Sequence, residues 1–200
     1  MVQTKKQKTK MLAEGAVMIA LATVLSFIQI VKFPWGGAIT VLSMLPIVFF
    51  SLRYGVKYGF AISFVYSIIQ LVQGIIDGLF GWGLTPIALI ACIFIDYISA
   101  FAILGIAGIF GNKKLPAIIG GTVIALVCRF VFHYISGVFI FKSFGELWNG
   151  FSVESPYLYS LLYNGAYMLP EIIFTVIGAT VLLKTPAIRK MLFKNEDKKS

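Results

Sequence analysis

The feature that most limits what this chain can fold into is a series of long apolar stretches that carry almost no charge. Six of them occur, at about 11–31, 40–52, 58–76, 85–110, 115–141 and 159–183. About 20 apolar residues suffice for a helix to cross the hydrocarbon core of a bilayer. Only 12% of the 200 residues are charged, about half the usual share in soluble proteins. The chain is therefore typical of a membrane protein, and a soluble, disordered or coiled-coil chain is excluded.

Backbone groups in lipid must find hydrogen-bond partners within the protein, which favours helices. The alternating segments of about 10 residues that form a membrane β-barrel are absent. We therefore predict an all-α integral membrane protein with six transmembrane helices, forming a single membrane domain over residues 1–200. Within it, 11–184 would form the six-helix bundle, and 1–10 and 185–200 would be basic tails.

The basic residues indicate the topology. Most of the 17 Lys and Arg residues fall in the two tails and in alternate loops: Lys5, Lys6, Lys8, Lys10, Arg53, Lys57, Lys113, Lys114, Lys184, Arg189, Lys190, Lys194, Lys198 and Lys199. The opposite loops hold only Lys32 and Lys142. The positive-inside rule then predicts a multi-pass protein of the cell membrane with both termini cytoplasmic. Topology explains the net charge of +9, so we expect no nucleic-acid partner.

Four ionisable side chains lie inside the predicted spans, where such groups are costly and usually functional. They are Asp96, Arg129, His133 and Glu171. Arg129 and His133 are four residues apart and share one helix face. Two interpretations stay open: Asp96 and Arg129 form a structural ion pair between helices, or these groups line a polar cavity.

Further polar groups favour the cavity. Asn164, Tyr167 and Glu171 are spaced to share one face of the last span, although Glu171, beside Pro170, is also a candidate structural partner. Aromatic faces attract cations, a carboxylate pairs with positive charge, and an amide offers both donors and an acceptor. Such a cavity suits a small, flat, nitrogen-containing cation.

Enzyme chemistry is not indicated. The phosphate-binding motif G-x-x-x-x-G-K-[ST] does not occur, so we expect no ATP hydrolysis by this chain. Ser136 lies three residues from His133 on one predicted helix, an arrangement that rarely produces a nucleophilic serine. Cys92 and Cys128 lie in apolar stretches, as inert buried thiols do. We expect no catalytic residue, no metal site and no cofactor.

Small residues line one side of the first span. Ala13, Ala16 and Ala20 recur at helical spacing, and small residues allow a second helix to approach closely. The stripe is either internal packing or a docking face for a partner protein.

Two stretches in the second half of the chain carry a distinctive pattern. Residues 129–137 read Arg-Phe-Val-Phe-His-Tyr-Ile-Ser-Gly, and residues 159–165 read Tyr-Ser-Leu-Leu-Tyr-Asn-Gly. With these and the stretches 13–26 and 94–108, the chain resembles, over essentially its whole length, the thiamine-specific S components of energy-coupling factor (ECF) transporters.

The resemblance implies six helices with cytoplasmic termini, and capture of thiamine from outside the cell. It also implies assembly with a transmembrane T component and two ATPase subunits, which drive release into the cytoplasm. The residues it places on the substrate are Trp35, Asp96, Tyr97, Arg129, His133, Phe141, Tyr159 and Asn164. It places Ala16 and Ala20 on the T component.

The chain departs from the family pattern at several positions. Asp96 stands where Glu is usual, Arg129 where Lys is found, and Phe141 where a stacking Trp is common, with Trp148 as a candidate replacement. No residue of the segment 74–86 is assigned. An S component for another vitamin or precursor stays an alternative. So does a self-sufficient secondary transporter with Asp96 or Glu171 as proton site, although the chain shows no inverted repeat.

Overall fold

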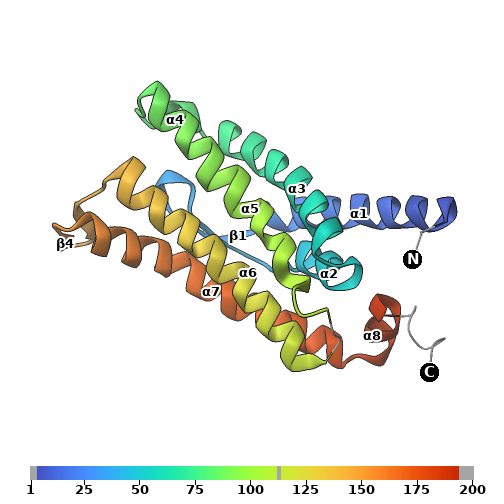
Figure 1. Cartoon of the computed structure of the whole chain (residues 1–200). Coiled ribbons are helices and arrows are strands. Elements are labelled where there is room, and N and C mark those ends of the chain that lie inside the picture. Colours follow the sequence, from blue (N-terminus) through green and yellow to red (C-terminus); the bar gives the residue numbers. More distant parts are fainter. Residues whose placement is uncertain (1–3, 112–113, 194–200) are drawn as a thin grey trace.

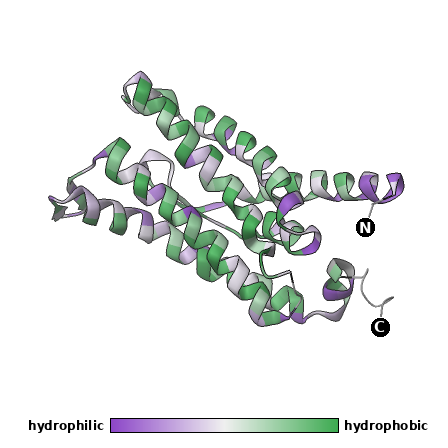
Figure 2. Ribbon diagram, in the orientation of Figure 1, coloured by the Kyte–Doolittle hydropathy of each residue, from purple (hydrophilic) through white to green (hydrophobic). Residues whose placement is uncertain are grey.

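A computed structural model describes residues 4–111 and 114–193 (Figure 1). Within these residues, five helical rods are long and apolar enough to cross a membrane. They are α1 (Lys5–Ser26), α3 (Val56–Ile76), the rod α4–η3–α5–η4 (Pro86–Cys92, Ile93–Ser99, Ala100–Ala102, Ile103–Gly108), α6 with η5 (Leu115–Ser136, Gly137–Phe141), and α7 (Pro156–Lys184). Their apolar residues extend along the rods in Figure 2, whereas hydrophilic colour gathers at the start of α1 and on α8.

Helix α1 starts inside the predicted N-terminal tail. Thr4 and Gln7 form a capping box, in which each side chain accepts a hydrogen bond from the other residue's backbone N–H (3.3 and 2.9 Å). Such a box satisfies amides that the first helical turn leaves without partners. The residues predicted as an N-terminal tail are therefore helical from Lys5 onward, and residues 5–10 are exposed.

A β-hairpin replaces helix at the junction of the first two predicted spans. Strands β1 (Gln29–Lys32) and β2 (Ala38–Thr40) pair antiparallel around the short helix η1 (Pro34–Gly36). Trp35 and Gly36 take left-handed backbone conformations, with φ of 59° and 86°, which reverse the chain. A second hairpin, β3 (Gly145–Trp148) and β4 (Phe151–Val153), precedes α7. The all-α prediction is wrong at these two hairpins.

Helix α2 (Leu45–Tyr54) is the shortest of the predicted spans. Its ten residues are about 15 Å long, half the thickness of a bilayer core of about 30 Å. Residues 45–51 are all buried, and Ile47 joins Tyr66, Phe101, Leu104 and Leu126 in one apolar cluster. Helix α2 therefore lies in the centre of the bundle.

The C-terminal segment is also more ordered than predicted. Helix α8 (Pro186–Phe193) follows α7, and its Ile188 and Phe193 pack against a cluster that contains Leu45 and Leu183. The described part of the predicted tail over 185–200 is therefore helical from Pro186 onward and contacts the bundle. Lys113, Lys194, Lys198 and Lys199 lie outside the described residues. The start of α1 and helix α8 lie at the same end of the bundle in Figure 1, opposite the β3–β4 hairpin.

Candidate ligand-binding site

One cavity lies between the α1–α3 side and the α6–α7 side of the bundle, with the β1–β2 hairpin as part of its wall. All eight residues predicted to contact a ligand line it: Trp35, Asp96, Tyr97, Arg129, His133, Phe141, Tyr159 and Asn164. They come from η1, η3, α6, η5 and α7. The structure thus gathers residues up to 129 positions apart in sequence, and their contact with a ligand stays a prediction.

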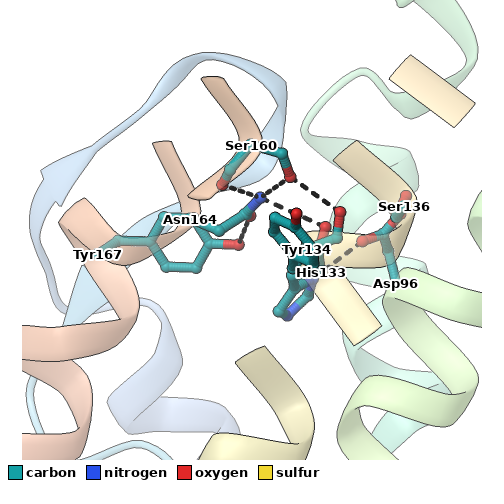
Figure 3. Close-up of polar contacts among 7 residues, drawn as sticks. All are labelled: Asp96, His133, Tyr134, Ser136, Ser160, Asn164 and Tyr167. Carbon is teal, nitrogen blue, oxygen red and sulfur yellow. Dashed lines mark hydrogen bonds and ion pairs between the residues drawn. The ribbon is translucent and has the colours of Figure 1, made fainter. Parts of the chain in front are cut away.

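The Asp96 carboxylate contacts two side chains of α6. Its Oδ1 lies 2.9 Å from Nδ1 of His133, and its Oδ2 accepts a hydrogen bond from the Ser136 hydroxyl (Figure 3). Asp96 belongs to the π-helix η3, and π turns occur often at functional sites. Within 4–111 and 114–193, Nε2 of His133 is buried without a hydrogen-bond partner, and His133 is one of the residues that line the cavity. The imidazole is therefore oriented by Asp96 and retains one free nitrogen.

Arg129 does not form the ion pair with Asp96 that one interpretation required. Its guanidinium carbon lies 4.2 Å from the centre of the Phe101 ring, and Nη1 lies 2.6 Å from the Met44 sulfur. Among the described residues, Nε of Arg129 has no hydrogen-bond partner. The second interpretation, a polar cavity, agrees with the structure.

Asn164 joins α6 to α7. Its Nδ2 is within hydrogen-bond distance of the His133 carbonyl (3.3 Å) and of the carbonyl and hydroxyl of Ser160 (2.9 and 3.1 Å). The Tyr167 hydroxyl donates to Oδ1 at 2.7 Å (Figure 3). Because both amide hydrogens are occupied, Asn164 has only acceptor capacity left for a ligand. We call Asp96, Arg129, His133 and Asn164 the charged wall.

Three aromatic rings meet at one part of the cavity wall. The ring centres of Trp35, Trp82 and Phe141 lie 6.0–6.4 Å from one another. Trp82 lies in the segment 74–86, to which the sequence assigned no role. Trp148 instead stacks on Phe151 at 6.0 Å and is not among the residues that line the cavity. Trp82 therefore takes the place beside Phe141 for which Trp148 was the sequence-based candidate.

The opposite side of the cavity was not predicted. Ser26 of α1 donates to Oε1 of Gln73 at 2.9 Å, and Nε2 of Gln70 donates to both of them at 3.2 and 3.1 Å. All three side chains line the cavity, and we call them the amide wall. The signal was present as Ser63, Ser67, Gln70 and Gln73, which recur at helical spacing in the stretch 58–76.

Glu171 lies inside the bundle, whereas the alanines of the predicted docking stripe lie on its surface. Glu171 is buried and lines the cavity, and its carboxylate accepts hydrogen bonds from the backbone N–H and the hydroxyl of Thr40. Ala16 and Ala20 are exposed on α1 and do not line the cavity.

Known proteins resemble this chain in sequence and in fold. Residues 12–190 match the model of a family described as thiamine transporter protein. The chain is 31% identical over 188 residues to thiamine transporter ThiT of Bacillus subtilis (strain 168), a match that covers 87% of this chain and 90% of the relative. A solved structure of ThiT from Listeria monocytogenes shares the fold, with a TM-score of 0.68, 24% identity, and coverage of 90% of this chain and 97% of that one.

Proposed function

The chain belongs to the thiamine transporter protein family, and from this premise we propose that it is the thiamine-binding S component of an ECF-type importer. The observation that carries the proposal is a cavity lined by a carboxylate, an imidazole, an amide and a group of aromatic rings. Thiamine is a cation with two aromatic rings, a thiazolium and a polar aminopyrimidine, which match these groups in kind.

Each part of the cavity has a proposed role. The rings of Trp35, Trp82 and Phe141 form an aromatic surface for the ligand, since aromatic faces attract cations. The Asp96 carboxylate balances the positive charge. Nε2 of His133 and the Tyr163 hydroxyl, both buried without partners among the described residues, are free to bond the polar edges of the aminopyrimidine.

The proposed topology has six crossings and cytoplasmic termini. Five rods cross as full helices, and α2 completes the sixth crossing together with β2 and residues 41–44. Non-helical backbone at membrane depth is tolerated where protein buries it, and residues 43–51 are all buried. An even number of crossings would leave both termini on one side, which agrees with the start of α1 and helix α8 lying at the same end of the bundle in Figure 1. The cavity then opens to the outside.

The proposed partners are a transmembrane T component and two ATPase subunits, with the exposed Ala16 and Ala20 as the docking stripe. The double change Ala16→Trp and Ala20→Trp should abolish thiamine uptake by the reconstituted complex, because the new side chains block close helix approach. Thiamine binding by the isolated subunit should persist, since neither residue lines the cavity. Val65→Trp, at a position 47% exposed on α3, is the matched control and should preserve uptake. Loss of binding together with uptake would show instead that the stripe serves internal packing.

Calorimetric titration of the purified protein with thiamine and a panel of other vitamins tests the proposed function. We expect tight binding of thiamine alone. Tight binding of a different vitamin, with none of thiamine, would replace the substrate. Thiamine uptake into vesicles that hold this protein without partner subunits would contradict the S-component assignment.

A further inference from the structure

The β1–β2 hairpin rests along α7. The Phe33 ring lies 6.0 and 5.9 Å from the rings of Tyr163 and Tyr167, measured between centres. Gly37 lies close against the Tyr167 ring. A Cβ placed on this glycine would lie 2.9 Å from two of the ring carbons, so a larger residue would not fit there. Since Trp35 and Gly37 line the cavity, the position of the hairpin on α7 determines the shape of that wall.

A buried contact holds the end of β2. Glu171 is 1% exposed, and its Oε1 accepts hydrogen bonds from the backbone N–H of Thr40 and, at 2.7 Å, from the Thr40 hydroxyl. The same hydroxyl lies 2.6 Å from that of Ser43. Further along, Leu42 contacts Gly178 of α7 so closely that a Cβ on the glycine would lie 2.7 Å from a Leu42 methyl. A buried carboxyl group is costly unless it is hydrogen-bonded, so Oε1 favours this contact, whereas Oε2 is buried without a partner among the described residues.

An exposed contact holds the other strand. Nζ of Lys32 in β1 lies 2.7 Å from Oδ1 of Asp77 at the end of α3, and these side chains are 52% and 30% exposed. Exposed ion pairs are weak and are screened by salt. The hairpin is thus fastened by a buried contact on α7 and by an exposed, weaker contact on α3.

We propose that Glu171 is a positioning residue, which fixes the base of the β1–β2 hairpin on α7 in the place where the hairpin walls the cavity. When the hairpin opens, the Lys32–Asp77 ion pair between β1 and the end of α3 breaks before the contact with Glu171. Glu171 acts on a ligand through Thr40 and the hairpin. The ligand-binding part of this inference rests on the proposed function, whereas the anchoring of the hairpin does not.

Hydrogen–deuterium exchange of the whole, ligand-free protein tests the anchoring, because local opening sets amide exchange. Glu171→Leu removes the acceptor at similar volume, and exchange in peptides covering 28–44 should rise about tenfold or more, the size expected from loss of a charge-assisted hydrogen bond. Glu171→Gln retains an acceptor oxygen and should restore slow exchange. Glu154→Gln, an exposed change in the outer loop, is the control and should leave the hairpin unchanged.

Stopped-flow tryptophan fluorescence with thiamine supplies the second readout. Glu171→Leu should accelerate dissociation about tenfold without slowing association, as interface losses usually do. Lys32→Gln should accelerate both rates and leave the Kd within about threefold of wild type. If Glu171→Leu does not fold, Thr40→Val removes the hydroxyl partner without altering α7 and should shift exchange in the same direction.

Unchanged hairpin exchange in Glu171→Leu or, if that variant does not fold, in Thr40→Val would overturn the anchoring. So would equal increases in Glu171→Leu and Glu171→Gln. If wild type shows slow hairpin exchange but does not bind thiamine, the proposed function is refuted. The anchoring is not, because the exchange measurements on the variants test it independently of any ligand.

Discussion

The charged wall and the amide wall of the cavity are both polar, yet their hydrogen bonds differ. On the amide wall, Ser26, Gln70 and Gln73 bond to one another and thereby tie α1 to α3. On the charged wall, Nε2 of His133 and Nε of Arg129 are buried without a partner among the described residues. Buried polar groups are nearly always hydrogen-bonded. From this difference we expect a ligand to bond to the charged wall, whereas the amide wall bonds to itself.

Removing the charge from the charged wall should have the largest effect. In Asp96→Asn, we expect thiamine affinity to fall about a hundredfold or more, because loss of one partner of a buried charge pair costs about 3–5 kcal/mol. Calorimetric titration of the folded variant measures the change. Asp77→Asn is the control, since Asp77 also lines the cavity but is paired with the exposed Lys32. Its affinity should stay within about threefold of wild type.

The opposite pattern of affinities would exclude Asp96 as a contact of the ligand's positive charge. If Asp96→Asn binds thiamine normally while Asp77→Asn does not, the positive charge lies near the end of α3. The carboxylate next to His133 would then serve only to orient the imidazole.

An intermediate effect is expected at the junction of α6 and α7. Asn164→Ala removes the acceptor of the Tyr167 hydroxyl and the donor to the His133 carbonyl. Leaving such buried groups without partners costs about 1–3 kcal/mol, so affinity should fall about ten- to a hundredfold. Titrations with thiamine and with separate pyrimidine and thiazole fragments measure it. We expect the pyrimidine to suffer more, because Asn164 supports His133.

Equal losses for both fragments would show that Asn164 acts through the general packing of α6 against α7. Asn149→Ala, at an exposed position in the β3–β4 turn, serves as control and should leave both fragments unaffected.

The charged wall could be predicted from the sequence because its residues are conspicuous. Asp96, Arg129 and His133 are ionisable groups in apolar stretches, where each needs a partner or a function. Helical spacing then placed Arg129 and His133 on one face, and both line the cavity in the structure. The five long rods were predictable for a similar reason, since apolar length alone determines them.

The hairpins and the amide wall escaped prediction because their signals are ambiguous. Residues 28–31 continue the apolar stretch of α1, and only the turn at 34–37 separates strand from helix. A short apolar segment fits either structure. Gln70 and Gln73 carry no charge, so nothing in a single sequence distinguishes a helix tie from a ligand contact. Trp82 was missed because loop tryptophans usually anchor a protein at the membrane interface.

A substitution in the amide wall should have the smallest effect on thiamine binding, and it directly tests whether the two walls differ in function. Gln73→Leu keeps most of the side-chain volume but removes the acceptor that Ser26 and Gln70 share. Leaving buried donors without that acceptor costs about 1–3 kcal/mol, so thermal unfolding in detergent should occur at a lower temperature than in wild type. Thiamine affinity should change by less than about threefold, because the wall bonds to itself. If the affinity instead falls as far as in Asn164→Ala while the unfolding temperature is unchanged, the ligand contacts both walls. Their difference in hydrogen bonding would then reflect only the ligand-free state.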